Sequence, residues 1–286
     1  MTALNTPVNR LLRPLQAVAA AVRVENLSIP GFIDRIAARL YRPATEAGAL
    51  PTVLYFHGGG FVAGSLDDAD VPARYITAHA QVAVLSVAYS LAPTRPFPAA
   101  PEDAHAAGMW LLENGKRLHL DTQHMAVAGD DAGGNLAAAL ALIARDRNGP
   151  ALVAQVLIGP MLDPSMTKLG DAARLGSDLK PETCASCYAK YLRNPFERLH
   201  PYASPLESRR LTGLPPALIL TAERDVLHKE AEQYAGALIA AGVPTQITRF
   251  AANHADLPEH VPLLAEAADF LRRHLHPPRQ TRKAIA

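Results

Sequence analysis

Residues 126–136 have the pattern of a nucleophile elbow, a sharp turn that presents one reactive side chain. A short apolar strand is expected to end at Gly129, and an Ala-rich helix to begin just after Asp131. Gly129 and Gly133 flank Asp131, where a larger side chain would collide with the neighbouring strand or helix. The start of the helix favours negative charge beside it. The pattern therefore predicts Asp131 at the nucleophile position, where the usual G-x-S-x-G motif has serine.

A second group of residues could supply main-chain hydrogen-bond donors. Residues 52–56 form a continuous apolar run, typical of a strand buried on both faces, and His57-Gly58-Gly59-Gly60 follows it directly. Glycines at the carboxyl end of a central strand allow N–H groups to point into a cavity. We therefore expect an anion-binding loop beside the elbow, with His57 as a candidate substrate-binding residue.

An acid and a histidine follow the elbow in the chain order of a hydrolytic triad. Asp225 comes shortly after a predicted strand over 217–221, and His254 shortly after a predicted strand over 246–250. The order nucleophile, acid, histidine is that of α/β-hydrolases. We predict that Asp225 orients His254 and that His254 reaches back to Asp131. The neighbouring Asp130 is predicted to be structural, hydrogen-bonded beneath the turn.

These residues need a scaffold that brings strand ends together, and the alternation of strands and helices predicts one. Strands of this kind, alternating with helices of about a dozen residues, form a mostly parallel sheet with helices on both faces, and ligands bind at the carboxyl ends of the strands. Strands are expected near 24–29, 36–40, 52–56, 82–87, 125–128, 153–158, 217–221 and 246–250. Helices are expected over 70–79, 181–192, 229–241 and 258–274. Two more are expected, one that ends near 112 and one that follows the elbow and ends near 145. The whole chain, 1–286, is predicted to be a single α/β domain.

Residues 161–205 interrupt this alternation, and such an insertion is a natural lid over a pocket. Its predicted helix carries Tyr188 and Tyr191, which are three residues apart and therefore share a face. Their hydroxyl groups are candidate substrate-binding groups that could protonate an opening epoxide ring. The alternative is that both rings pack the lid onto the core.

Several motifs at consistent spacing resemble the hormone-sensitive lipase family of α/β-hydrolases. The similarity runs from about residue 29 to about 275. It rests on His57-Gly58-Gly59-Gly60, Tyr89 with Leu91-Ala92-Pro93 and Phe97-Pro98, the elbow, Tyr202-Ala203-Ser204-Pro205-Leu206, Thr221-Ala222-Glu223 with Asp225, and His254.

The resemblance implies a role for each matching position. Gly58, Gly59 and the N–H of Ala132 would form the oxyanion hole, Asp225 would be the acid and His254 the base. Residues 1–25, expected to be mainly helical, and 161–205 would form a helical cap. Members of the family hydrolyse short-chain carboxylic esters without a cofactor, so a hydrolase of a small, mostly uncharged ester or lactone is the leading expectation.

Asp131 departs from the family pattern, which has serine there, and this leaves alternatives open. A carboxylate is already ionised at neutral pH and could displace at an epoxide or related alkyl carbon, giving an alkyl-aspartyl ester that His254 then hydrolyses. Attack on an ester carbonyl would give a mixed anhydride that mostly collapses backwards. A third possibility is a small-molecule binder, or a serine enzyme altered at this one position, in which Asp131 locks a protonated His254.

Composition excludes several other classes. The chain has 286 residues and a net charge of +1, so nothing draws it to nucleic acid or to an acidic membrane surface, and no apolar run is long enough to span a bilayer. Its two cysteines, Cys184 and Cys187, lack the partners of a zinc site, and no metal or cofactor is expected. The expected partner is a small-molecule substrate and the expected location is the cytoplasm, while a homodimer is left open.

Overall fold

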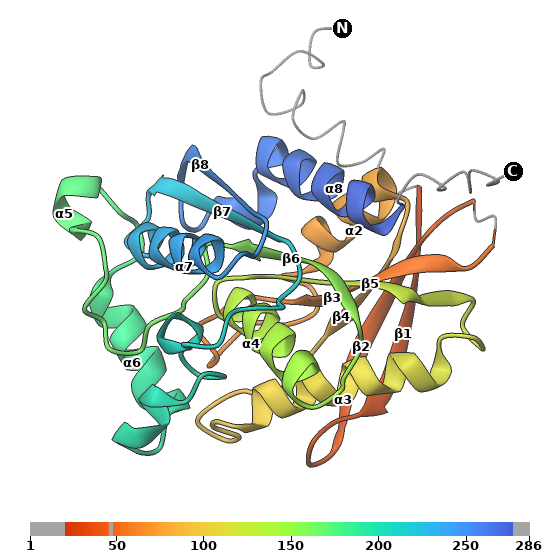
Figure 1. Ribbon diagram of the computed structural model, residues 1–286, viewed down its shortest axis with the longest axis horizontal. Coiled ribbons are helices and arrows are strands. Elements are labelled where there is room, and N and C mark those ends of the chain that lie inside the picture. Colours follow the sequence, from red (N-terminus) through yellow and green to blue (C-terminus); the bar gives the residue numbers. More distant parts are fainter. Residues whose placement is uncertain (1–20, 46–47, 277–286) are drawn as a thin grey trace, which may run out of the picture.

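The computed structural model describes residues 21–45 and 48–276, and these form one eight-stranded sheet between two layers of helices (Figure 1). The strands are β1 (Val22–Pro30), β2 (Arg35–Pro43), β3 (Leu50–Phe56), β4 (Ala83–Val87), β5 (Leu120–Asp130), β6 (Leu152–Ile158), β7 (Ala217–Arg224) and β8 (Thr245–Asn253). Each strand predicted from the sequence is present, and most extend beyond their predicted ends.

The strand order is β1-β2-β4-β3-β5-β6-β7-β8. The strand β2 is antiparallel to both of its neighbours, β1 and β4. All other neighbouring pairs of strands, from β4 with β3 through β7 with β8, are parallel. The carboxyl ends of β3, β5, β6, β7 and β8 therefore meet at one edge of the sheet. This edge is where the sequence places the glycine loop, the elbow, the acid and the histidine, and the predicted α/β-hydrolase fold is confirmed.

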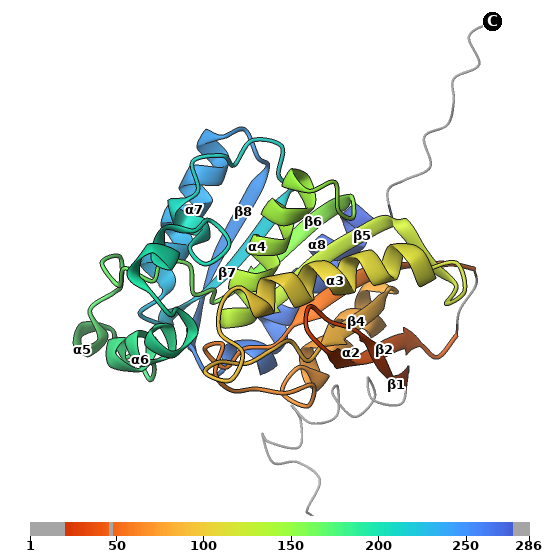
Figure 2. The same cartoon turned by 90° about the horizontal axis from the view of Figure 1, so that it is seen from below.

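The helices cover both faces of the sheet (Figure 2). The helices α3 (Ala99–Asn114), α4 (Ala132–Asp146) and α7 (His228–Ala240) lie on one face, and α2 (Asp70–Ala80) and α8 (Val261–Leu275) lie on the other. Alternate side chains of β3 serve the two cores: Leu54 and Phe56 pack with α3 and α4, whereas Val53 and Tyr55 pack with α2 and α8. A strand buried on both faces is continuously apolar for this reason.

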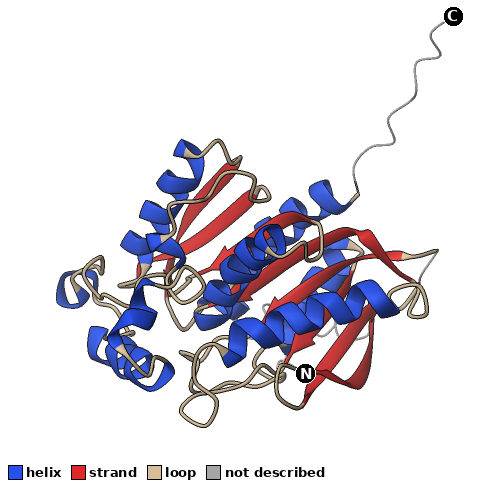
Figure 3. Cartoon of the chain, turned by 60° about the horizontal axis from the view of Figure 1, so that its bottom comes forward, coloured by secondary structure: helices blue, strands red, loops and turns tan. Residues whose placement is uncertain are grey.

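The insertion between β6 and β7 contains α5 (Ala172–Leu175), α6 (Pro181–Tyr191) and the 3₁₀ helices η1 (Pro195–Leu199) and η2 (Pro205–Glu207). Figure 3 shows these short helices beside one end of the sheet. The helix predicted over 181–192 is therefore present. Within the described part of the chain, no helix is long and apolar enough to cross a membrane.

The expectation of helix over residues 1–25 is wrong for residues 22 and 23, and the overlapping expectation of a strand from residue 24 is the correct one for residues 24 and 25. These residues belong to β1, which pairs with β2 from Val22 opposite Pro43 to Pro30 opposite Arg35 as an antiparallel hairpin. Main-chain pairing along the whole hairpin overrides any local preference for helix. Residues 1–20 of that predicted segment lie outside the described residues.

Candidate active site

The turn at Asp131 has the geometry of a nucleophile elbow. The strand β5 ends at Asp130, α4 begins at Ala132, and Asp131 between them has φ of +53°, a value that non-glycine residues rarely adopt. A Cβ atom on Gly129 would overlap the carbonyl oxygen of Gly133, and one on Gly133 would overlap the main chain at the end of β3. The predicted requirement for both glycines is confirmed.

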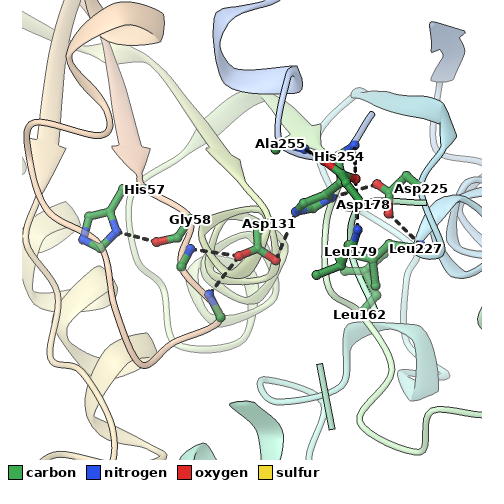
Figure 4. Close-up of polar contacts among 12 residues, drawn as sticks. His57, Gly58, Asp131, Leu162, Asp178, Leu179, Asp225, Leu227, His254 and Ala255 are labelled. Carbon is green, nitrogen blue, oxygen red and sulfur yellow. Dashed lines mark hydrogen bonds and ion pairs between the residues drawn. The ribbon is translucent and has the colours of Figure 1, made fainter. Parts of the chain in front are cut away.

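Asp131, Asp225 and His254 come together at the carboxyl edge of the sheet (Figure 4). The Nδ1 atom of His254 lies 2.9 Å from Oδ2 of Asp225, and its Nε2 atom lies 3.8 Å from Oδ1 of Asp131. Asp225 is fully buried and is held in place because its Oδ1 accepts a hydrogen bond from the N–H of Leu227 (2.9 Å). The sequence therefore identified three side chains that the fold does bring together.

The charge state of His254 follows from its two carboxylate neighbours. Burial by itself lowers the pKa of His254, but the negative charges of Asp225 and Asp131 outweigh burial and raise this pKa from 6.5 to about 9. At neutral pH the imidazole is therefore a cation between two anions. A protonated imidazole can donate a proton but cannot accept one, so His254 becomes a base only when the pH approaches 9 or when Asp131 loses its charge.

The main-chain donors that face Asp131 are those of Gly59 and Gly60, each with its N–H nitrogen 2.8 Å from Asp131 Oδ2. Both glycines have positive φ, +108° and +60°, which turns their N–H groups toward the elbow. The carboxylate of Asp131 thus occupies these two donors itself. Ala132 is fully buried at the first position of α4, and its N–H as a further donor stays a prediction.

The prediction of Gly58 as an oxyanion donor is wrong by one residue. The Cα atom of Gly58 is packed against Asp130, where an added Cβ would overlap the carboxylate, and its carbonyl oxygen lies 2.7 Å from Nδ1 of His57. Asp130 is held from the other side by the hydroxyl of Tyr55, at 2.8 Å, and burial raises the pKa of Asp130 to about 7. Gly58 therefore packs under the turn, and Asp130 has the structural role predicted for it.

His57 does not line the site, contrary to its prediction as a substrate-binding residue. Its side chain is 1% exposed and stacks on Tyr89 with ring centroids 4.4 Å apart, and the Tyr89 hydroxyl donates to the His57 carbonyl oxygen at 2.8 Å. Burial lowers the pKa of His57, which keeps the ring neutral at pH 7. His57 therefore anchors the start of the glycine loop.

Tyr188 and Tyr191 are packing residues and do not line the cavities around Asp131. Both are buried, and their rings contact Phe61 at centroid distances of 5.9 Å and 3.9 Å. This aromatic cluster fixes α6 on the loop that follows the glycines. The predicted substrate-binding role is therefore wrong for both residues, and the alternative, packing of the lid onto the core, is confirmed.

Two cavities meet at Asp131 and His254, which line both of them. One has a volume of about 510 Å³ and includes Asp67, Asp68 and Glu259 among its walls. The other has a volume of about 360 Å³ and a mostly apolar wall made by Val62, Met161, Leu179, Thr183, Cys184 and Cys187. Asp131 and His254 therefore lie between two spaces, each large enough for one arm of a small molecule.

The two cysteines are part of the apolar wall. Both thiols are free, and burial raises the pKa of Cys184 and of Cys187, so both stay uncharged at neutral pH. Among the residues that the structure describes, no group of histidine, cysteine and acidic side chains is arranged to hold a metal ion.

Sequence reasoning missed two features of the site. The first is Gly60 as a main-chain donor to Asp131, because three consecutive glycines do not reveal which two N–H groups turn toward the elbow. Asp178, in the insertion, accepts hydrogen bonds from the N–H groups of His254 and Ala255. No motif or periodicity marks Asp178, and it is 76 positions from His254 along the chain.

Comparison with known proteins agrees with this fold. The model of the alpha/beta hydrolase fold family matches residues 53–255. The chain is 39% identical over 240 residues to the esterase LipI of Mycobacterium tuberculosis, covering 82% of this chain and 74% of that protein. It is 41% identical over 214 residues to the ethyl acetate hydrolase of Pseudomonas putida, covering 73% and 67%.

Solved structures show the same similarity. The hyperthermophilic esterase of the archaeon Pyrobaculum calidifontis superposes with a TM-score of 0.83 at 36% identity, over 92% of this chain and 91% of that one. The carboxylesterase EstE1, cloned from a metagenomic library, superposes with a TM-score of 0.84 at 34% identity, over 97% and 100%. The fold and site define an α/β-hydrolase, and the chain belongs to that family. Within the family it groups with enzymes of the esterase type.

Proposed function

We propose that this protein hydrolyses a small, mostly uncharged carboxylic ester or lactone, with Asp131 at the nucleophile position. One arrangement carries the proposal: the Asp225–His254 pair and the N–H groups of Gly59 and Gly60 meet at residue 131 from opposite sides. Acyl transfer needs a base on one side of the carbonyl group and oxyanion donors on the other. The esterase relatives support the same conclusion.

Asp131 changes how an ester would react in this site. If its carboxylate attacked the carbonyl carbon, the tetrahedral intermediate would expel carboxylate more readily than alkoxide and return to substrate. We infer a route in which Asp131 stays unmodified. Neutral His254 takes a proton from water, the water oxygen bonds to the carbonyl carbon, and Gly59 and Gly60 hold the oxyanion. The bond to the alcohol oxygen then breaks, and that oxygen receives the proton from His254.

This route has two requirements that the geometry makes explicit. The Oδ2 atom of Asp131 must leave the N–H groups of Gly59 and Gly60 before a substrate carbonyl can bind them. His254 must be neutral, although its pKa is about 9. We therefore expect ester hydrolysis by this protein to be slow at neutral pH and to rise toward pH 9.

The test is to replace Asp131 by serine and measure hydrolysis of p-nitrophenyl acetate and butyrate at pH 7. In Asp131→Ser the serine hydroxyl becomes a nucleophile that His254 can deprotonate, and no carboxylate occupies the two donors or faces Nε2 of His254. Activity should therefore rise roughly 100-fold or more, at least the scale of effect that oxyanion donors have. The matched control is Asp131→Asn, which also removes the negative charge but keeps the shape of the carboxylate and supplies no nucleophile, so it should show no such gain. Equal activities of the two variants would contradict an esterase site around residue 131.

A specific observation favours a second candidate, hydrolysis of an epoxide or a related alkyl electrophile. With Oδ2 of Asp131 held by two N–H groups, Oδ1 remains as the attacking atom and faces His254 at 3.8 Å. Oδ1 would bond to the epoxide carbon, the carbon–oxygen bond of the ring would break, and that oxygen would take the Nε2 proton of His254.

The second step of this candidate returns the enzyme to its starting state. The new ester is uncharged, so the negative charge opposite His254 is lost and the neutral imidazole can take a proton from water. The water oxygen attacks Cγ of Asp131, the N–H groups of Gly59 and Gly60 hold the oxyanion, and the diol leaves with a proton from His254. The Asp131 carboxyl group then gives its proton to His254.

A single turnover in heavy-oxygen water distinguishes the two candidates. The alkyl-aspartyl route places the label in the peptide that contains Asp131, which mass spectrometry detects, whereas the ester route leaves that peptide unlabelled. Diol formation with an unlabelled peptide would exclude the covalent route. Binding without turnover across esters, lactones and epoxides would contradict both candidates and leave a small-molecule binder.

A further inference from the structure

Asp178 connects the insertion to the loop that carries His254 (Figure 4). It lies between α5 and α6, and its carboxylate spans two consecutive main-chain donors. Its Oδ1 accepts from the N–H of His254 at 3.1 Å, and its Oδ2 accepts from the N–H of Ala255 at 3.0 Å. Oδ1 also accepts from the N–H of Leu179 at 3.0 Å, which fixes the carboxylate on its own segment.

We propose that Asp178 is a positioning residue for His254: its carboxylate clamps the main chain of the histidine loop, so that the insertion helps to hold the imidazole between Asp225 and Asp131. Hydrogen bonds to an ionised acceptor are stronger than those between neutral groups, and two of them from one side chain also fix orientation. The strand β8 ends at Asn253, so at His254 the sheet no longer holds the chain.

The hydrogen bonds of Asp178 also connect the walls of the two cavities that meet at Asp131 and His254. Leu179, next to Asp178, lines the apolar cavity, and Ala255 lines the larger cavity on the other side of His254. A shift of the insertion at this point therefore moves a wall of the apolar cavity and the backbone of the base together. Asp178 also adds a third negative charge near the imidazole, beside those of Asp225 and Asp131, and all three favour its protonated form.

The chain offers a matched control in Asp171. It lies in the same insertion, and its Oδ1 also accepts from two main-chain N–H groups, those of Ala173 and Arg174, both at 3.1 Å. Those partners belong to its own segment at the start of α5, so Asp171 does not reach the histidine loop. Asp171→Asn therefore measures the loss of a local capping carboxylate, and Asp178→Asn measures the loss of the clamp.

The first readout is an NMR titration of the His254 ring, with its signal assigned by its absence from the His254→Gln variant. Asp178→Asn should lower the pKa of His254, because one of the three anions becomes neutral, whereas Asp171→Asn should leave it unchanged. The second readout is amide hydrogen exchange. In Asp178→Ala, exchange at His254 and Ala255 should become roughly 10-fold faster, because both N–H groups lose their acceptor. Circular dichroism checks that each variant is folded.

The third readout rests on the proposed function and uses ester turnover in the Asp131→Ser background. Adding Asp178→Ala should lower kcat roughly 10- to 100-fold with a smaller change in KM, since small misplacements of a base cost that much. Adding Asp171→Asn should leave both constants unchanged. If the Asp131→Ser parent has no activity, the proposed function fails, while titration and exchange still decide on Asp178. An unchanged pKa and unchanged exchange in the Asp178 variants, or equal changes in Asp171→Asn, would overturn the positioning role.

Discussion

The ion pair between Asp131 and His254 gives the most direct prediction. Asp131→Asn keeps the shape of the side chain and removes its charge. Two unit charges 3.8 Å apart, at an effective dielectric constant of about 20, attract each other by about 4 kcal/mol. The hydrogen bonds from Gly59 and Gly60 draw the charge toward the other carboxylate oxygen, so this value is an upper bound. Asp225 contributes more than Asp131 to the raised pKa of His254 and is kept in this variant, so Asp131→Asn should lower that pKa from about 9 only part of the way toward 6.5.

The same change alters how the stability of the fold depends on pH. Because folding raises the pKa of His254 from 6.5 to about 9, protonation of this ring stabilises the folded state fully below pH 6.5, and the stabilisation is lost as the pH rises through 9. The full contribution is about 3 kcal/mol. Between pH 6 and pH 10, the free energy of unfolding of the wild type should therefore fall by more than that of Asp131→Asn.

Urea unfolding at pH 6, 8 and 10 measures this difference, and an NMR titration of the His254 ring measures its cause. Comparing the two proteins in the same buffers cancels the contributions of the other groups that titrate in this range. The reasoning would be refuted if the His254 ring of the wild type titrated near its ordinary value. It would equally fail if Asp131→Asn left that titration where it was.

Three further predictions concern the scaffold of the site. Gly59→Ala should lower stability and turnover together, because residue 59 has φ of +108° and an added Cβ would overlap a main-chain carbonyl. The control is Gly236→Ala in α7, where an added Cβ has no described atom within 4 Å, and it should raise the melting temperature. Tyr191→Ala should lower the free energy of unfolding by roughly 3 kcal/mol or more. Tyr191→Phe should change it little, because the buried hydroxyl has no hydrogen-bond partner among the described residues. Asp225→Asn should lower the pKa of His254 and reduce turnover at every pH, which pH–rate profiles measure; an unchanged profile would contradict a role for Asp225.

The sequence by itself determined the fold and the meeting of three candidate catalytic side chains. The alternation of buried strands and helices specifies a mostly parallel sheet, and in such a sheet residues that follow strand ends gather at one edge. Asp131, Asp225 and His254 each follow a strand end, so their meeting could be predicted without coordinates. The glycines at 129 and 133 were likewise predictable, because the turn leaves no room for a Cβ atom.

Only the tertiary structure determined which main-chain donors bind Asp131 and which distant residues hold the site in place. Which two of three adjacent glycines point at Asp131 depends on the φ values of the loop, and residue type does not specify them. The rings of Tyr188 and Tyr191 face inward because Phe61, more than a hundred residues away in the chain, fills the space beside them. Asp178 meets His254 only because the insertion folds back over the edge of the sheet. Contacts between distant segments depend on the path of the whole chain, and a local pattern of residues does not specify that path.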